Sequence, residues 1–142
     1  YAGRIIRITR RKVSTVTFEA SPVLDAAQVA DLLALDKGQG TFFARFVNVF
    51  LSGAEDKIVK LRGHAESADA AAVADAAHAL RGASGNVGAV RLADVCGRVE
   101  VAGQQQDMHA ARELIALLDT EFALARGALL AAAGRGIPAD AP

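Results

Sequence analysis

A histidine, an arginine and three glycines stand close together in the stretch AAHALRGASGNVGA, residues 76–89. Arg81 follows His78 by one helical turn, and two of the glycines are Gly82 and Gly85. A glycine inside a helix lowers the stability of the helix by up to about 1 kcal/mol relative to alanine. The pattern therefore indicates that positions without side chains near the imidazole serve a function. A histidine side chain that is largely uncharged at neutral pH can act as a nucleophile, and a nearby guanidinium can bind the oxygens of a phosphoryl group.

A helical wheel places His78 opposite the aliphatic face of its segment. At about 100° per residue, Ala74, Gly82 and Gly85 fall within about 40° of the histidine, while the larger aliphatic side chains fall on the opposite arc. We therefore expect His78 to point into solvent, on a surface kept flat by Ala74, Gly82 and Gly85 and wide enough for another protein's active site. Arg81, about 60° to one side, can reach a phosphoryl group on the ring.

The composition favours one soluble helical domain. The chain has 142 residues, enough for a single domain with its own core. Hydrophobic residues make up 52% but aromatic residues only 5%, so the apolar content consists mainly of small aliphatic side chains suited to close-packed helices. No apolar run approaches the roughly 18 residues that a membrane span needs. The single cysteine, Cys96, can form no disulfide within the chain and suits a reducing compartment.

Five helical segments are predicted after residue 20. The spacing of apolar residues predicts a short helix over 21–35, with Asp25 as its N-cap, and four longer helical segments over 41–64, 65–88, 89–106 and 107–134. Ser67 is the predicted N-cap of the third segment, and Asp107 begins the last. Four long amphipathic helices joined by short turns predict an all-α fold, an antiparallel up-and-down four-helix bundle with a short additional N-terminal helix.

The charge is unevenly distributed along the chain. Residues 1–20 carry a net charge of +4, and because the whole chain is neutral, residues 21–142 carry −4. We interpret 1–20 as a basic linker or extended segment, a solvated connector to an upstream domain, with a juxtamembrane or RNA-binding role as the alternative. The remainder, 21–142, is the predicted bundle domain. Its mildly acidic character argues against nucleic-acid binding, because phosphate contacts need clustered Lys and Arg.

The stretch AHALRGASGNVGAVRLADVCGRVE, residues 77–100, resembles the signature of histidine-containing phosphotransfer (HPt) domains. In that signature a histidine is followed by an apolar residue, a basic residue, a glycine, small residues and a further glycine before the next helix. The resemblance implies that His78 is the phosphoacceptor, that Arg81 steadies the phosphoryl group and that Gly82 keeps the docking surface open. Gly88 corresponds to the glycine near the turn into the next helix.

The resemblance extends to Glu100. Family members often carry Gln or Glu at the corresponding position, near the active histidine. This implies that the Glu100 carboxylate binds the second ring nitrogen of His78, fixes its tautomer and raises the nucleophilicity of the exposed nitrogen. The chain has Arg at position 81 where Lys is commoner, and both are basic.

The family resemblance implies a phosphorelay intermediate. His78 would accept a phosphoryl group from a receiver-domain aspartate and pass it to another receiver. No cofactor is expected to be bound, and Mg²⁺ is expected in the partner receiver. The basic start without an initiator Met favours the C-terminal module of a hybrid sensor kinase, located in the cytoplasm or at the cytoplasmic end of a membrane-anchored kinase. The alternative is a non-catalytic docking module that binds and regulates a receiver or another signalling protein without phosphotransfer.

Other candidate residues are interpreted as structural or surface positions. His64 and His109 share no helical i, i+4 spacing with His78, so no metal site is expected. Cys96 lies on the predicted inner face of its helix, where a thiol acts as a small hydrophobic group. The stretch GASGNVG follows a helix and lacks the Lys-Ser/Thr ending of a nucleotide-binding loop, so the domain is not expected to be a kinase by itself.

Overall fold

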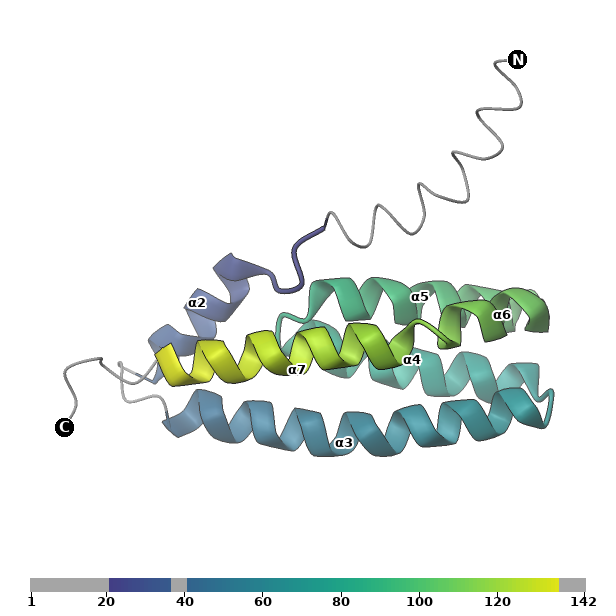
Figure 1. The fold of residues 1–142 in the computed structure, drawn as a ribbon, viewed down its shortest axis with the longest axis horizontal. Coiled ribbons are helices and arrows are strands. Elements are labelled where there is room, and N and C mark those ends of the chain that lie inside the picture. Colours follow the sequence, from purple (N-terminus) through teal and green to yellow (C-terminus); the bar gives the residue numbers. More distant parts are fainter. Residues whose placement is uncertain (1–20, 37–40, 136–142) are drawn as a thin grey trace, which may run out of the picture.

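The computed structural model describes residues 21–36 and 41–135. These residues form six helices, labelled α2 to α7 in Figure 1. In chain order they are α2 (Ala26–Leu35), α3 (Thr41–Glu66), α4 (Ala70–Asn86), α5 (Val90–Gln104), α6 (Met108–Ile115) and α7 (Leu118–Arg135). The predicted basic segment 1–20 and the last residues of the predicted domain lie outside the described ranges.

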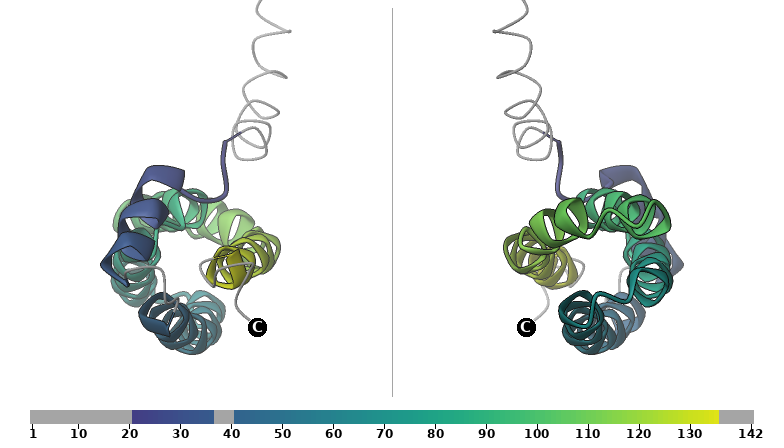
Figure 2. Two further views of the ribbon diagram at one scale, coloured as in Figure 1. Left: turned by 90° about the vertical axis from the view of Figure 1, so that its left-hand side faces the viewer. Right: turned by 90° about the vertical axis from the view of Figure 1, so that its right-hand side faces the viewer.

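The long helices form an up-and-down bundle, as predicted. In Figure 1 helices α3, α4, α5 and α7 run along the long axis; short turns join α3 to α4 and α4 to α5, and the short helix α6 lies between α5 and α7. Seen end-on in Figure 2, they surround a common axis, with α2 lying obliquely across one end. The all-α fold class and the position of the short first helix are therefore confirmed.

The core is built from small aliphatic side chains and a few phenylalanines. Helix α3 contributes many of its larger side chains, because apolar residues recur at spacings of three and four along its 26 residues. Buried residues of α3 include Phe43, Val47, Phe50, Ala54, Ile58 and Leu61. Phe46 of the same helix is partly buried and packs against this core. The other helices contribute mainly Val, Leu and Ala.

The prediction that Ser67 caps the third segment was wrong. Ser67 directly follows α3 and continues its hydrogen-bond pattern, since its backbone N–H donates to the Gly63 carbonyl at 3.1 Å. Ala68 then adopts a left-handed conformation with φ of 56°, and Asp69 becomes the N-cap by accepting from the Ala72 N–H at 3.1 Å. The predicted cap Asp25 is confirmed, and Asp107, the predicted start of the last segment, is the N-cap of α6.

The last predicted helix is also interrupted. Helix α6 ends at Ile115 and α7 begins at Leu118, so the segment 107–134 is not one continuous helix. At the break the Leu117 N–H donates to the Leu114 carbonyl, three residues back, at 3.0 Å. This tighter turn replaces the regular i to i−4 pattern. Neither Pro nor Gly marks the position in the sequence.

A buried ion pair joins α5 to α7. Arg91 donates from Nε and Nη2 to the two carboxylate oxygens of Glu121, at 2.8 and 2.9 Å, and both side chains are buried. Nη1 of Arg91 also donates to the Ser21 carbonyl at 3.2 Å. The Asp25 N–H donates to the Gly88 carbonyl at 2.8 Å. The segment before α2 is thus fastened to the start of α5 and to the turn between α4 and α5.

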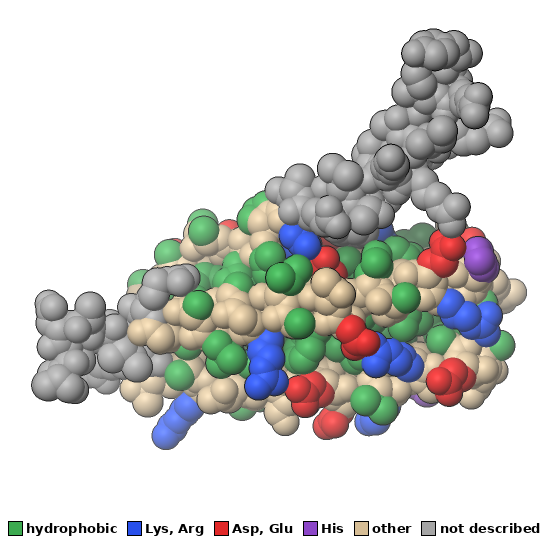
Figure 3. All heavy atoms as spheres, in the orientation of Figure 1, with side chains coloured by type: hydrophobic (Ala, Val, Ile, Leu, Met, Phe, Trp, Pro, Cys, Tyr) green, Lys and Arg blue, Asp and Glu red, His purple; other side chains and the backbone are tan. Residues whose placement is uncertain are grey.

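On the face shown in Figure 3, acidic and basic side chains are interspersed rather than gathered into a patch of one sign. None of the described helices combines the length and the apolar character required of a membrane span.

Gly103 is expected to be essential for the close approach of α4 to α5. A Cβ at this position would lie 2.9 Å from both the Ala70 carbonyl oxygen and the Ala74 backbone nitrogen. Gly103→Ala should therefore cost about 1–3 kcal/mol of stability, because backbone atoms cannot move aside cheaply. Chemical denaturation measures this change. Gly127→Ala, where a Cβ meets nothing within 4 Å, is the control and should instead be stabilising; equal effects at both sites would contradict this account.

Candidate functional site

His78 lies on α4 and projects outward from the bundle. Its side chain is 72% exposed, whereas the aliphatic residues Val73, Ala77 and Leu80 of the same helix are buried. The wheel-based prediction for the direction of His78 agrees with this position. The structure therefore presents an imidazole that a second protein can reach.

Glu100 on α5 binds both His78 and Arg81. Its Oε2 lies 2.7 Å from Nδ1 of His78, and its Oε1 accepts from Nη1 of Arg81 at 2.9 Å. An ionised carboxylate can only accept hydrogen bonds, so Nδ1 carries the proton, and in the neutral ring Nε2 then has a free lone pair. The structure thus brings together the three polar residues that the sequence singled out, from two neighbouring helices.

The Glu100 carboxylate is buried yet ionised. Its side chain is only 11% exposed. This burial acts to raise the pKa of Glu100, but the hydrogen bonds from Arg81 and His78 and the positive charge of Arg81 outweigh it and hold the pKa below the ordinary value of 4.5. At neutral pH the carboxylate therefore keeps its charge and its bond to the ring.

The lowered pKa of Glu100 predicts a stability change in acid. Because Glu100 is more acidic in the folded than in the unfolded chain, its contribution is complete above the unfolded value and is lost as pH falls through the folded value. We expect wild type to lose stability relative to Glu100→Gln as the pH falls through and below the ordinary value of 4.5. Urea unfolding at a series of pH values measures this difference, and a constant difference between the two proteins would refute the assignment.

Arg81 makes an ion pair that the sequence did not predict. Its side chain, 55% exposed, runs across α5 to Glu100. Its atoms pass over Gly97, where a Cβ would lie 3.4 Å from Cδ of Arg81. Sequence reasoning expected the guanidinium to reach a phosphoryl group and did not anticipate the ion pair with Glu100. The contact with phosphoryl oxygens stays a prediction.

Two of the three predicted surface positions are open. A Cβ at Gly82 or Gly85 would meet no atom within 4 Å, so neither glycine is required by internal packing. Ala74, by contrast, is buried at 8% exposure, because α4 and α5 approach closely where Gly103 faces it. The expectation that Ala74 forms part of an open surface needs this correction. Its role in docking stays a prediction, as do those of the glycines.

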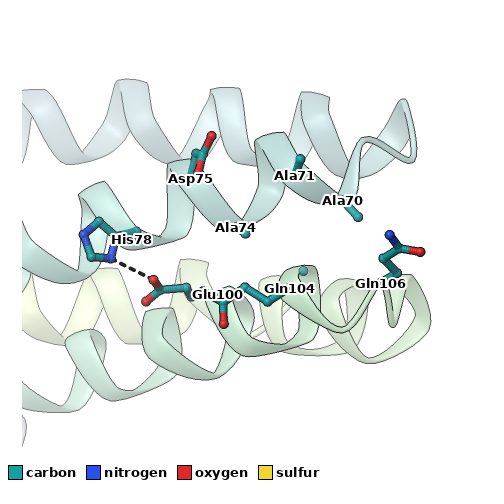
Figure 4. A pocket seen from close by; sticks show the side chains of 9 residues that line it. Ala70, Ala71, Ala74, Asp75, His78, Glu100, Gln104 and Gln106 are labelled. Atoms are coloured by element: carbon teal, nitrogen blue, oxygen red, sulfur yellow. Dashed lines mark hydrogen bonds and ion pairs between the residues drawn. The ribbon is translucent and has the colours of Figure 1, made fainter.

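A shallow groove runs between α4 and α5 beside His78. Figure 4 shows the His78 ring and the Glu100 carboxylate pointing toward each other, with Gln104 and Gln106 further along the groove and Asp75 directed away from it. Ala74 forms part of the wall. The groove therefore leads directly to the imidazole.

The turn after α4 needs a glycine. Gly88 adopts φ of +82°, a conformation that residues with a side chain rarely adopt, and lies two residues before the start of α5. This agrees with the predicted place of Gly88. Gln28 of α2 donates from Nε2 to the Gly85 carbonyl at 2.6 Å and so binds the free end of α4. The contribution of Gln28 was not anticipated, because it pairs residues 57 positions apart.

The remaining candidates lie apart from this site. His109 pairs with Glu113 on its own helix at 3.3 Å. Across residues 21–36 and 41–135, no group of three or more His, Cys, Asp or Glu side chains is arranged to hold a metal ion. Cys96 is buried, and this burial raises the pKa of its thiol to about 12. A thiol with so high a pKa is a poor nucleophile, in agreement with the structural interpretation.

Comparisons with known proteins agree with this site. The family model for the Hpt domain matches residues 45–128, which include His78, Arg81 and Glu100. Among solved structures, the histidine-containing phosphotransfer protein B (HptB) from Pseudomonas aeruginosa PAO1 is similar, with a TM-score of 0.73 and 27% sequence identity over 81% of this chain and 97% of that chain. Comparison with curated proteins gives no match. The chain therefore belongs to the Hpt family, whose histidine-containing domains serve as phosphoryl-carrying intermediates in phosphorelays with receiver domains.

Proposed function

We propose that His78 accepts the phosphoryl group on Nε2 from a receiver-domain aspartyl phosphate and yields it to the aspartate of another receiver. One observation carries this proposal: Nδ1 of an imidazole that is 72% exposed is held at 2.7 Å by a buried carboxylate. The held nitrogen cannot attack, so the lone pair that remains available belongs to Nε2. The proposal includes the cytoplasmic location of the protein that the sequence analysis predicts.

The site can carry out the transfer without moving a proton. The Nε2 lone pair attacks phosphorus, the bond between phosphorus and the aspartyl oxygen breaks, and the electron pair leaves with the receiver carboxylate. The ring becomes a phosphoimidazolium, whose positive charge is stabilised by the Nδ1–H bond to Glu100. In the return step a receiver carboxylate attacks phosphorus, and the electron pair of the P–N bond returns to Nε2.

The receiver must supply the rest of the chemistry. Phosphoryl transfer needs positive charge around the equatorial oxygens, usually from Mg²⁺ and basic side chains. The cation that the structure places beside His78 is Arg81, whose Nη1 is already bound to Glu100. Mg²⁺ is therefore expected to be bound by the partner receiver. The open backbone at Gly82 and Gly85 favours this close approach.

A transfer assay tests the proposal. The chain is mixed with a phosphorylated receiver domain and Mg²⁺, and the labelled product is treated with acid and with base. We expect rapid labelling of a bond that acid cleaves and base does not, as for a phosphohistidine. Tight receiver binding without labelling would instead favour a docking module and overturn the proposal.

Two replacements of Glu100 should separate the effect of orienting the His78 ring from the effect of the carboxylate charge. Glu100→Ala removes the acceptor for Nδ1–H, and we expect the transfer rate to fall about 10- to 100-fold, the usual loss when a partner that orients a histidine is removed. Glu100→Gln keeps a carbonyl oxygen that can accept from Nδ1–H, so its loss should be smaller. Initial rates with one receiver measure both variants. Equal rates for Glu100→Ala and wild type would show that transfer does not depend on the hydrogen bond between Glu100 and the His78 ring.

A further inference from the structure

The Glu100 carboxylate is held at both of its oxygens from one helix. His78 and Arg81 lie three residues apart on α4, and each binds a different oxygen of Glu100, at 2.7 and 2.9 Å. A carboxylate held only by the imidazole can rotate about its broad terminal torsion, whereas two bonds fix its plane. The Arg81 bond therefore constrains the same group that orients the ring.

Gly97 leaves room for Arg81 to make this bond. Gly97 lies on α5, three residues before Glu100. A Cβ at Gly97 would lie 3.4 Å from Cδ, 3.5 Å from Nε and 3.9 Å from Cζ of Arg81. The side chain thus crosses α5 over bare backbone before Nη1 meets Glu100. One added carbon would make ordinary contact, but a branched side chain would occupy the space of the guanidinium.

We propose that Arg81, lying across Gly97, is a positioning residue that promotes phosphoryl transfer chiefly through Glu100 rather than by contact with the phosphoryl group. This inference rests on the proposed acceptance of phosphate by His78. When the guanidinium is lost, the carboxylate is no longer fixed, and the tautomer with the proton on Nδ1 is less strongly selected. Fewer molecules then offer a free lone pair on Nε2.

A double-mutant cycle tests whether Arg81 acts through Glu100. Arg81→Met keeps the unbranched stem over Gly97 and removes the guanidinium. We expect it to slow transfer from a phosphorylated receiver about 10-fold in the wild-type background but less than about twofold in the Glu100→Gln background. The control is Arg126→Met, which removes an exposed guanidinium paired with Glu55, and should leave the rate unchanged. The same loss in both backgrounds would show direct action on the phosphoryl group and overturn the proposal.

A second readout needs no phosphoryl donor. The ¹⁵N spectrum of the His78 ring reports which nitrogen carries the proton. We expect Arg81→Met and Gly97→Val to reduce the fraction protonated on Nδ1, and Gly97→Ala to leave it unchanged. Unchanged spectra for the first two variants would also overturn the inference. Failure of wild type to be phosphorylated would refute the proposed function instead, while the spectra would still test the role of Arg81.

Discussion

A His78→Gln variant is expected to accept no phosphoryl group from a phosphorylated receiver. Gln at this exposed position should fold normally, since the His78 side chain is 72% exposed and contributes little to the core. It lacks a nucleophilic nitrogen, so the loss of transfer should be complete rather than partial. Labelling with a ³²P-phosphorylated receiver measures the effect, and circular dichroism checks the fold.

The other two histidines provide matched controls. His64→Gln, near the end of α3, and His109→Gln, in the first turn of α6, make the same chemical change elsewhere on the bundle. Both should be labelled at the wild-type rate. Residual labelling of His78→Gln that disappears only when another histidine is also replaced would show that the acceptor has been assigned to the wrong residue.

Glu121→Ala is expected to be the most destabilising of the side-chain truncations considered. It leaves the guanidinium of Arg91 buried without its bidentate partner, and breaking one side of a buried ion pair typically costs about 3–5 kcal/mol. A domain of this size has only about 5–15 kcal/mol of stability in total. The variant should therefore unfold at a much lower urea concentration than wild type.

An exposed ion pair between α3 and α7 provides the comparison for the loss of stability. Glu55→Ala removes the partner of Arg126, and the side chains of this pair are 57% and 52% exposed. Because solvent screens such a pair, we expect a change below about 1 kcal/mol. Similar losses of stability for Glu55→Ala and Glu121→Ala would mean that the Arg91 pair is not the buried link that the structure indicates.

The fold could be predicted well where apolar spacing alone determines it. The apolar spacing of α3, the cap at Asp25 and the helix start at Asp107 follow local rules, and the structure confirms them. The start of α4 was misplaced because Ser67 and Asp69 are both good caps, and the left-handed turn at Ala68 selects between them. The ion pair between α5 and α7 could not be predicted, because its two partners stand 30 residues apart and each resembles a surface residue in the sequence.

The site could be predicted in its residues but not in all of its contacts. The glycine pattern and the family resemblance together selected His78, Arg81 and Glu100, and these three meet in the structure. The path of Arg81 across Gly97 depends on how α4 packs against α5, which no local spacing reports. The burial of Ala74 has the same origin, since it follows from the bare backbone of Gly103.

The position of phosphorus on the ring tests the account most directly. After phosphorylation of ¹⁵N-histidine-labelled protein by a receiver, NMR coupling between ³¹P and ¹⁵N identifies the nitrogen that carries the phosphoryl group. We predict coupling to Nε2 of His78, because Nδ1 is bound to Glu100. Phosphorus on Nδ1, or on any other residue, would contradict the proposal that Glu100 holds one nitrogen so that the other can react.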